Sequence, residues 1–259
     1  MDCDLVFDIG MNDGDDTAYY LSRAHRVVAV EADSRLVIRA RERFSAIPPE
    51  RLTIVDAALA DRPGLVDFWI NEEKSYFNSL QASVAGCNGM RTHKTVVESI
   101  TLPDLFQQFG VPYYLKCDIE GGDIHCVRGL SAVVDPPQYL SVEATSLELL
   151  MLMWRAGYTK FKIVDQLAHN YRLKWNNETL LGRIKGSFQH CCISLDRRVL
   201  KTPRAHSRTS SGPFGEESPG DWLTFEDVAY EWLHREKGYA NRGHLNPRSW
   251  WDFHAKLEN

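Results

Sequence analysis

Four carboxylates surround a glycine turn near the start of the chain. The turn has the spacing Gly10-x-x-x-Gly14. The acids around it are Asp8, Asp13, Asp15 and Asp16. A pyrophosphate, the usual ligand of a Gly-rich turn that opens a helix, would be repelled by these like charges. A ligand that carries an ammonium and a sulfonium would be attracted by the same acids. The turn therefore favours S-adenosylmethionine over a dinucleotide.

The elements around this turn place it where a nucleotide-like ligand binds. Residues 4–9 predict a strand, and residues 15–24 predict the helix that follows the turn. A second strand over 26–31 ends on Glu31. Doubly wound folds bind a ribose hydroxyl through an acid at this point, about 20 residues after the turn. Glu31 therefore disfavours the alternative in which the acids only form a solvated helix start.

The composition is that of an ordinary globular protein. The 259 residues are 44% hydrophobic and 25% charged, with a net charge of −5, so we expect no nucleic-acid partner. No apolar run reaches the roughly 20 residues of a membrane span, so we expect no membrane partner. A strand that begins by residue 5 leaves no room for a secretory signal, and we expect a cytoplasmic protein. The cysteines lack Cys-x-x-Cys spacing, which favours reduced thiols and no structural zinc.

Strands and helices alternate along most of the chain. Further strands are predicted at 52–55, 65–70, 95–100, 112–118, 139–143, 160–164 and 189–195. Further helices are predicted through 36–44, 102–109, 124–130 and 146–156. This pattern is typical of an α/β fold with a Rossmann-like, doubly wound and mostly parallel sheet, and we expect its last strand to be antiparallel. The polar stretch 71–94 is a long loop, of a kind that is usually functional or disordered.

The character of the sequence changes near residue 200. We expect residues 1–199 to form a cofactor-binding domain and residues 200–259 to form a C-terminal extension that packs on it. Residues 200–221 are either a flexible linker or a lid, and a helix is predicted from Thr224. The tail has the aromatic sequence Trp250-Trp251-Asp252-Phe253-His254. Such a tail packs back on the domain or forms a partner surface, which makes a homodimer a hypothesis.

A second group of charged residues follows the strand at 112–118. It reads Tyr114-Leu115-Lys116-Cys117-Asp118-Ile119-Glu120-Gly121-Gly122-Asp123. This stretch resembles the Lys-x-Asp-x-Glu-Gly signature of FkbM-type methyltransferases, and the first turn with Glu31 resembles the cofactor half of a class I methyltransferase. The resemblance covers roughly residues 4–195. It implies the transfer of a methyl group from S-adenosylmethionine to a hydroxyl, commonly on sugars or polyketide-like natural products.

The resemblance also implies roles for individual residues. Those expected around the methionine part of the cofactor are Asp8, Gly10, Asn12, Asp13, Gly14 and Thr17. Glu31 is expected at the ribose, and Asp56 with the backbone of Ala57 is expected at the adenine edge. Ser79 matches a small hydroxyl residue that such proteins often have in this insertion. Residues expected beside the methyl group are Lys116, Asp118 and Glu120, with Glu143 on the same edge of the sheet.

A hydroxyl is a weak nucleophile at neutral pH, so a base within hydrogen-bond reach would help the transfer. Glu120 or Asp118 is our candidate, with Glu143 as a further carboxylate, because clustered acids raise one another's pKa. The alternative roles are structural: the two acids would hold a loop or helix start, and Lys116 would pair with one of them. Magnesium could bind Asp118 and Glu120 with another acid, but the family pattern requires no metal.

Two other classes of protein remain open from the sequence. The strand–turn–helix pattern alone also fits an NAD(P)-dependent Rossmann oxidoreductase, which the acidic turn disfavours. A methyltransferase-like binding or scaffold protein without turnover is the second alternative. Binding of S-adenosylhomocysteine rather than NAD separates the first alternative from a methyltransferase. Turnover with an acceptor separates the second.

Overall fold

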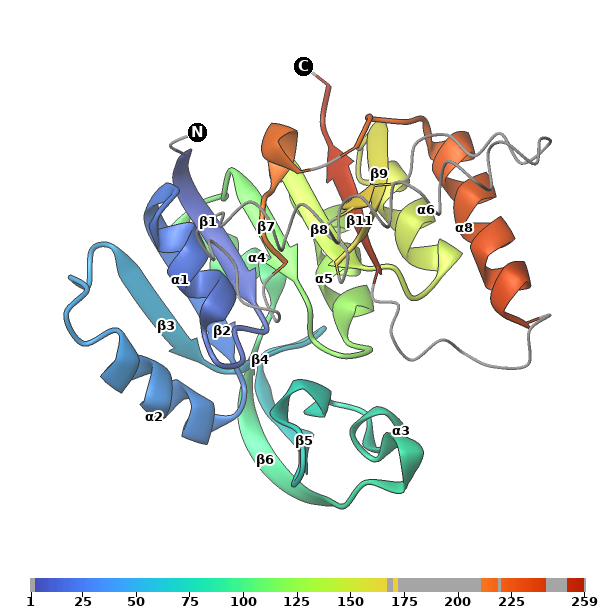
Figure 1. The fold of residues 1–259 in the computed structure, drawn as a ribbon. Coiled ribbons are helices and arrows are strands. Elements are labelled where there is room, and N and C mark those ends of the chain that lie inside the picture. Colours follow the sequence, from blue (N-terminus) through green and yellow to red (C-terminus); the bar gives the residue numbers. More distant parts are fainter. Residues whose placement is uncertain (1–2, 167–169, 172–210, 219, 241–250, 259) are drawn as a thin grey trace, which may run out of the picture.

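A computed structural model describes residues 3–166, 170–171, 211–218, 220–240 and 251–258 (Figure 1). Its main feature is an eight-stranded sheet in the order β10-β9-β11-β8-β7-β1-β2-β3. The parallel strands are β1 (Cys3–Ile9), β2 (Ala24–Glu31), β3 (Leu52–Asp56), β7 (Tyr114–Cys117) and β8 (Tyr139–Glu143). The expected Rossmann-like, mostly parallel α/β fold is thus confirmed.

The order of the parallel strands reverses at β1. The chain runs from β1 outward to β2 and β3, and later returns to place β7 and β8 on the other side of β1. In register, Asp8 of β1 lies opposite Lys116 of β7. Ligands of open α/β sheets bind at the carboxyl ends of the strands beside such a reversal. The two charged motifs therefore meet at one edge of the sheet.

The aromatic tail is a strand inside the central sheet. Strand β11 (Trp251–Lys256) pairs antiparallel with β8 on one side and with β9 (Lys160–Asp165) on the other. Phe253 lies between Val142 and Ile163 and is fully buried. The short β10 (Asn170–Tyr171) extends the sheet beyond β9.

Packing within the sheet accounts for the aromatic character of the tail. The antiparallel strand was expected at 189–195, which lies outside the described residues. The domain boundary at 199 and 200 lies outside them too and stays a prediction. The homodimer also stays a prediction. The aromatic tail was its reason, and Phe253 of that tail is buried inside the sheet and is not available to a partner.

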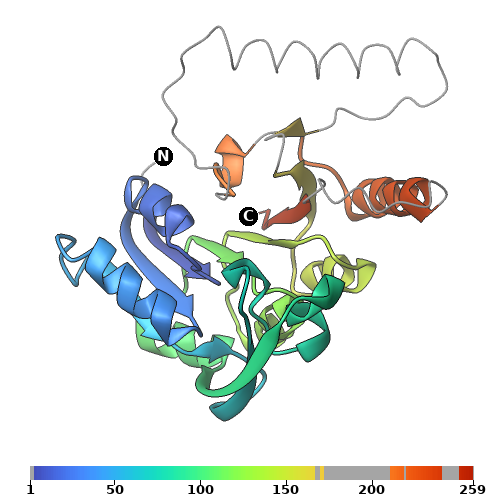
Figure 2. The ribbon, with the colours of Figure 1, turned by 60° about the horizontal axis from the view of Figure 1, so that its bottom comes forward.

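Helices cover both faces of the sheet (Figures 1 and 2). On one face, α1 (Asp15–Leu21) and α2 (Ser34–Arg43) pack their apolar residues against β1 and β2. On the other face lie α4 (Leu102–Phe109), α5 (Asp123–Gly129), α6 (Leu147–Arg155) and α8 (Phe225–Ala240). A 3-10 turn, η3 (Leu130–Ala132), follows α5. Within the part of the chain that the structure describes, no helix is both long and apolar enough to cross a membrane.

Residues of the C-terminal part complete the face on which α1 lies. Phe214 stacks on Tyr114 at 4.3 Å between ring centroids and meets Tyr20 edge-on. The main-chain N–H of Ser211 donates to the Asp16 carboxylate at 2.7 Å. The turn η4 (Gly215–Glu217) follows, and Tyr139 donates to Glu216 at 2.9 Å. The described residues from 211 to 218 therefore pack on the sheet.

The stretch expected to be a long loop belongs to a small second sheet. Its strands are β4 (Ala58–Leu59), β6 (Thr92–Ile100) and β5 (Gly64–Asn71), in that order. Between β5 and β6 the chain forms η1 (Ser75–Phe77), α3 (Ala82–Ala85) and η2 (Cys87–Gly89). Figures 1 and 2 show this insertion at the carboxyl edge of the central sheet. It supplies one wall of the site described next.

Candidate functional site

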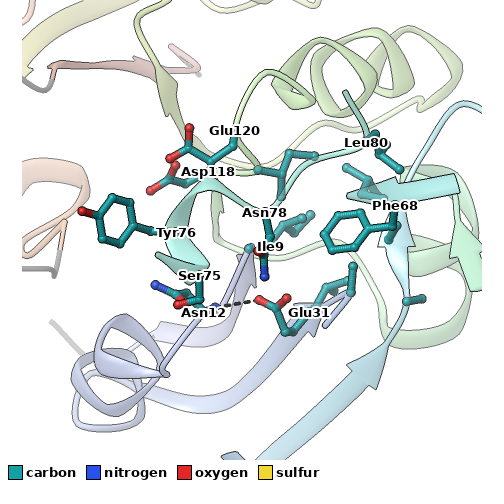
Figure 3. Close-up of a pocket in the computed structure, with 17 residues that line it drawn as sticks. Ile9, Asn12, Glu31, Phe68, Ser75, Tyr76, Asn78, Leu80, Asp118 and Glu120 are labelled. Atoms are coloured by element: carbon teal, nitrogen blue, oxygen red, sulfur yellow. Dashed lines mark hydrogen bonds between the residues drawn. The ribbon is translucent and has the colours of Figure 1, made fainter. Parts of the chain in front are cut away.

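A pocket opens at the carboxyl ends of β1, β2 and β7 (Figure 3). Six of the residues expected from the sequence line it: Gly10, Asn12, Glu31, Ala57, Asp118 and Glu120. In Figure 3, Glu31 lies at one end, and the carboxylates of Asp118 and Glu120 lie together at the other. The pocket therefore joins the two sequence motifs in one site.

Glu31 is held by two main-chain N–H groups. The N–H of Asn12 donates to Oε2 and the N–H of Asp33 donates to Oε1, each at 2.8 Å. Burial raises the pKa of Glu31 to about 7, although these hydrogen bonds oppose the shift. Each carboxylate oxygen keeps a second lone pair for another donor. The place of Glu31 at a ribose stays a prediction.

The turn after β1 brings its backbone into contact with the second motif. Gly10 has φ +86°, and a Cβ at this position would lie 1.9 Å from the main-chain oxygen of Asp118. Asn12 is also left-handed, with φ 50°, a conformation that asparagine tolerates better than most residues. Gly14, with φ 83°, caps the N-terminus of α1. The Cβ positions of Gly10 and Gly14 face the Asp118 backbone and the Phe44 ring, so the two glycines let the turn pack closely against these neighbours.

Lys116 lies behind the pocket in a buried cluster of acids. Its Nζ is 2.8 Å from Asp16, 3.5 Å from Asp118 and 3.7 Å from Asp8. Burial alone would lower the pKa of Lys116, but these carboxylates hold it well above its usual range. Thr17 donates to Asp8 at 2.5 Å, and burial raises the pKa of Asp8 to about 6. Asp8, Thr17 and Lys116 thus support the wall of the pocket from behind.

Four other expected residues lie around the pocket without lining it. Asp13 is at the exposed start of α1, where its carboxylate accepts from the N–H of Asp15 at 3.1 Å. Asp56 is exposed at the end of β3 and accepts from the Ser34 hydroxyl at 3.0 Å. The Ser79 hydroxyl donates to the main-chain oxygen of Glu120 at 2.7 Å. Glu143 ends β8, farther along the same edge.

The acids on the Glu120 side hold protons more tightly than isolated carboxyls. Burial raises the pKa of Glu120 to about 9, and the neighbouring charges of Asp118, Glu143 and Asp123 add to the shift. Burial, Asp118 and Asp123 raise the pKa of Glu143 to about 8. Burial is also the main cause that raises the pKa of Asp123, to about 7. A proton can therefore reside on this cluster near neutral pH.

Sequence reasoning missed two residues at this edge and, among other pocket residues, five that come from β5 and the insertion after it. Asp252 of β11 lies opposite Glu143 and accepts from the Gln166 amide at 2.6 Å. The pocket residues are Phe68, Ser75, Tyr76, Asn78 and Leu80. The long polar insertion was a signal for the last four, because loops of that length often carry function. Nothing in the sequence placed Asp252 or Gln166 beside Glu143.

The described residues offer no metal centre. Among them, no group of three or more His, Cys, Asp or Glu side chains has the geometry to hold a metal ion. His125, which follows the second motif, pairs with Asp61 at 2.7 Å. His169, His190 and His206 lie outside the described residues.

The fold is that of a class I methyltransferase, as the sequence predicted. The family model of the methyltransferase FkbM domain matches residues 8–160, which is more than half of the chain. The protein belongs to the FkbM methyltransferase family, as the two motifs predicted. This membership decides against an NAD(P)-dependent oxidoreductase.

Solved structures with a related fold include three methyltransferases. Methyltransferase FkbM from Methylobacillus flagellatus KT has 15% identity and a TM-score of 0.37 over 56% of this chain and 34% of its own. The C-terminal domain of precorrin-6Y C5,15-methyltransferase from Rhodobacter capsulatus has 14% identity and a TM-score of 0.37, with coverages of 64% and 68%. A methyltransferase from Geobacter sulfurreducens, solved with S-adenosylhomocysteine, has 10% identity and a TM-score of 0.37, with coverages of 99% and 85%.

These similarities are distant. The chain spans about a third of the length of the Methylobacillus protein, 34%. No curated protein matches the sequence. The family assignment therefore depends on the match to the FkbM domain. The chemical class of the methyl acceptor is inferred from the residues of the site.

Proposed function

We propose that the protein transfers a methyl group from S-adenosylmethionine to a hydroxyl of a small molecule, such as a sugar or another natural product. The observation that carries this proposal is the Glu120 carboxyl, which lies in the pocket with its pKa raised to about 9. A hydroxyl must lose its proton as it is methylated, and Glu120 can accept that proton in its ionised form, which becomes populated as the pH approaches 9. The resemblance of the two motifs to FkbM-type methyltransferases, which implies transfer to a hydroxyl, supports this acceptor class.

In this proposal the cofactor lies along the pocket. When bound, S-adenosylmethionine supplies a methyl group on a positively charged sulfur. In our proposal Glu31 accepts the ribose hydroxyls. Adenine lies beside Ala57 between the apolar side chains of Phe68 and Leu80, with Asp56 at its edge. The methionine part follows the backbone of the Gly10 turn toward Asp118 and Glu120, with Asp13, Gly14 and Ser79 supporting the turn and the Glu120 loop.

The acceptor would then lie on the Glu120 side of the pocket. Glu120 would take the hydroxyl proton, and Glu143, with its pKa raised to about 8, would serve as the second carboxylate of that side. Asp118 would face the methyl group while its charge is partly balanced by Lys116 at 3.5 Å. These carboxyl groups can accept hydrogen bonds, and when protonated they can also donate, so they suit a ligand rich in hydroxyls.

The test uses S-adenosylmethionine labelled with carbon-13 on the methyl group and a panel of sugars, phenols and polyketide alcohols. We expect a new O-methyl resonance with at least one acceptor and loss of this signal in Glu120→Gln. A label that appears on nitrogen or carbon would overturn the proposed acceptor class. Tight binding of S-adenosylhomocysteine without turnover on any acceptor would favour the non-catalytic binding protein.

A further inference from the structure

Residues 75–81 cross the pocket from the ends of β1 and β2 to the loop after β7. At one end, the Ser75 hydroxyl donates to the Asn12 side-chain oxygen at 2.8 Å, and the Asn78 amide donates to the Asp33 carboxylate at 3.0 Å. At the other end, the Gln81 amide donates to the main-chain oxygen of Gly121 at 2.8 Å. The segment thus joins the two halves of the site.

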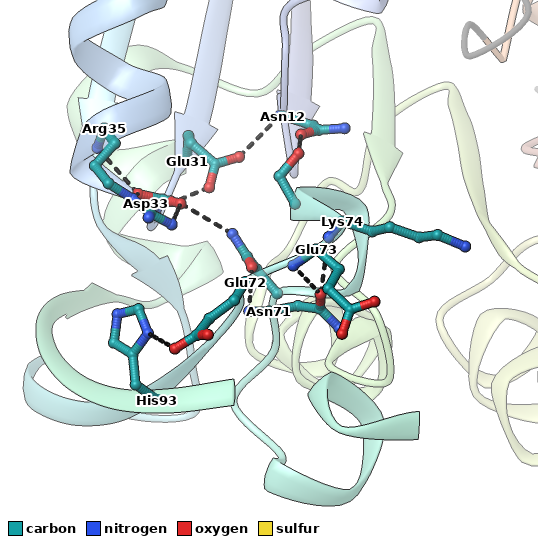
Figure 4. A network of polar contacts seen from close by, with 11 residues as sticks. Asn12, Glu31, Asp33, Arg35, Asn71, Glu72, Glu73, Lys74 and His93 are labelled. Atoms are coloured by element: carbon teal, nitrogen blue, oxygen red, sulfur yellow. Dashed lines mark hydrogen bonds and ion pairs between the residues drawn. The ribbon is translucent and has the colours of Figure 1, made fainter. Parts of the chain in front are cut away.

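The contacts at the first end converge on Glu31. Its carboxylate is held by the N–H groups of Asn12 and Asp33, each at 2.8 Å (Figure 4). These are the same two residues whose side chains receive hydrogen bonds from Ser75 and Asn78. The insertion therefore bonds the side chains of both residues whose main-chain N–H groups hold Glu31.

This arrangement is itself anchored. The Asn78 side-chain oxygen accepts from the N–H of Asn71 at 2.8 Å, and the Asn71 amide donates to the main-chain oxygen of Ala85 at 2.6 Å. Arg35 donates to Asp33 at 2.7 Å. Asn78 is 8% exposed and Asp33 is 3% exposed, so water competes little for their hydrogen bond.

We propose that Ser75 and Asn78 are positioning residues for the cofactor, which act through Asn12 and Asp33 to hold the Glu31 carboxylate toward the ribose hydroxyls. This role depends on the methyl donor and is independent of the acceptor class proposed above. A donor lost from this arrangement frees Asn12 or Asp33 to move, and Glu31 moves with it. The insertion between β5 and β6 then sets cofactor affinity without contributing the ribose-binding acid.

Calorimetric titration with S-adenosylhomocysteine tests the proposal. We expect Ser75→Ala and Asn78→Ala each to weaken binding by about tenfold, the effect of one hydrogen bond to a charged or tightly held group. Glu73→Gln is the matched control, because Glu73 is exposed in the same insertion and does not line the pocket. It should change affinity by less than about twofold. Affinities of both alanine variants within that range would overturn the proposal.

A second measurement separates positioning from a general loss of structure. The titrations of the two alanine variants are repeated in a Glu31→Gln background at high ligand concentration. If Ser75 and Asn78 act through Glu31, each alanine substitution should change the affinity by less than about twofold in this background, because the effects of substitutions at coupled residues are not additive. A tenfold effect that persists without the Glu31 carboxylate would overturn the role through Glu31. Circular dichroism of each unliganded variant checks that it is folded. If Asn78→Ala fails that check, the test is carried by Ser75→Ala, which removes only one hydroxyl.

Discussion

Gly10 lies in close backbone contact with Asp118, where the two motifs of the site meet. The α-carbon of Gly10 faces the main-chain oxygen of Asp118 so closely that a Cβ would lie 1.9 Å from it. The N–H of Asp118 in turn donates to the main-chain oxygen of Ile9 at 2.9 Å. Strand β1 and strand β7 therefore deliver their turns into direct backbone contact, and a side chain would force them apart.

Gly10→Ala is expected to cost more than about 4 kcal/mol of unfolding free energy, because both the clash and the φ of +86° oppose a side chain. Gly89→Ala is the matched control. Gly89 also has a positive φ, +73°, but nothing lies within 4 Å of its Cβ position. Only backbone strain of about 1 kcal/mol is expected there. Urea denaturation of the two variants compares them, and equal losses would contradict the close contact.

Glu31→Ala is expected to weaken S-adenosylhomocysteine binding by at least about 100-fold, because hydrogen bonds to a charged carboxylate contribute about 1.5–3 kcal/mol each. Calorimetry measures this loss. An affinity within about threefold of the wild type would remove Glu31 from the cofactor site.

The pH dependence of cofactor binding should follow the same carboxylate. Its pKa is raised to about 7 in the unliganded protein, and the ribose hydroxyls bind its ionised form. Affinity is therefore expected to be full above about pH 7 and to fall as the pH is lowered through that value. Titrations with S-adenosylhomocysteine at several pH values across this range test whether affinity falls toward acid pH. An affinity that rises toward acid pH would contradict it.

Glu120→Gln is expected to lower the rate of methyl transfer by about 100-fold or more while S-adenosylhomocysteine affinity stays within about threefold. With a pKa of about 9, the wild-type carboxyl becomes a base as the pH rises. The wild-type rate should increase up to about pH 9, and the variant should lose this increase. Rates with the acceptor found by methyl labelling provide the profile. An unchanged profile would assign the proton transfer to another group.

Lys116→Met is expected to destabilise the protein by about 3–5 kcal/mol, because it leaves the Asp8, Asp16 and Asp118 carboxylates without their buried counter-charge. Lys94→Met is the control, since Lys94 pairs with Asp67 at 3.1 Å on the surface. Exposed pairs contribute about 0–1 kcal/mol. Chemical denaturation of both variants measures the difference. Similar losses would mean that the buried cluster does not depend on Lys116.

Phe253→Ala is expected to lower the free energy of unfolding by about 3–5 kcal/mol, because the side chain is fully buried between β8 and β9. Leu65→Ala in β5 should change stability by less than about 0.5 kcal/mol, since Leu65 is 68% exposed. Thermal unfolding compares the two. A mild effect at Phe253 would argue against the place of β11 in the centre of the sheet.

The sequence by itself determined the cofactor half of the site. Gly10, Asn12 and Glu31 lie on consecutive strands and turns, so the strand–turn–helix pattern was enough to place them together. The charge of the acidic turn and the Lys-x-Asp-x-Glu-Gly motif predicted the family. The parallel sheet followed from the alternation of elements, because βαβ connections leave few topologies.

Only the tertiary structure decided the relationships between distant segments. The pairing of β11 with β8 and β9 depends on residues far apart in the chain, whose local pattern does not specify a partner strand. The Asn78–Asp33 hydrogen bond spans 45 residues and forms because the β5–β6 insertion folds over the pocket. The raised pKa of Glu120 is likewise a property of burial and of neighbouring charges. The sequence gives the type of each residue. The dielectric surroundings and the long-range partners of that residue arise only when the chain folds.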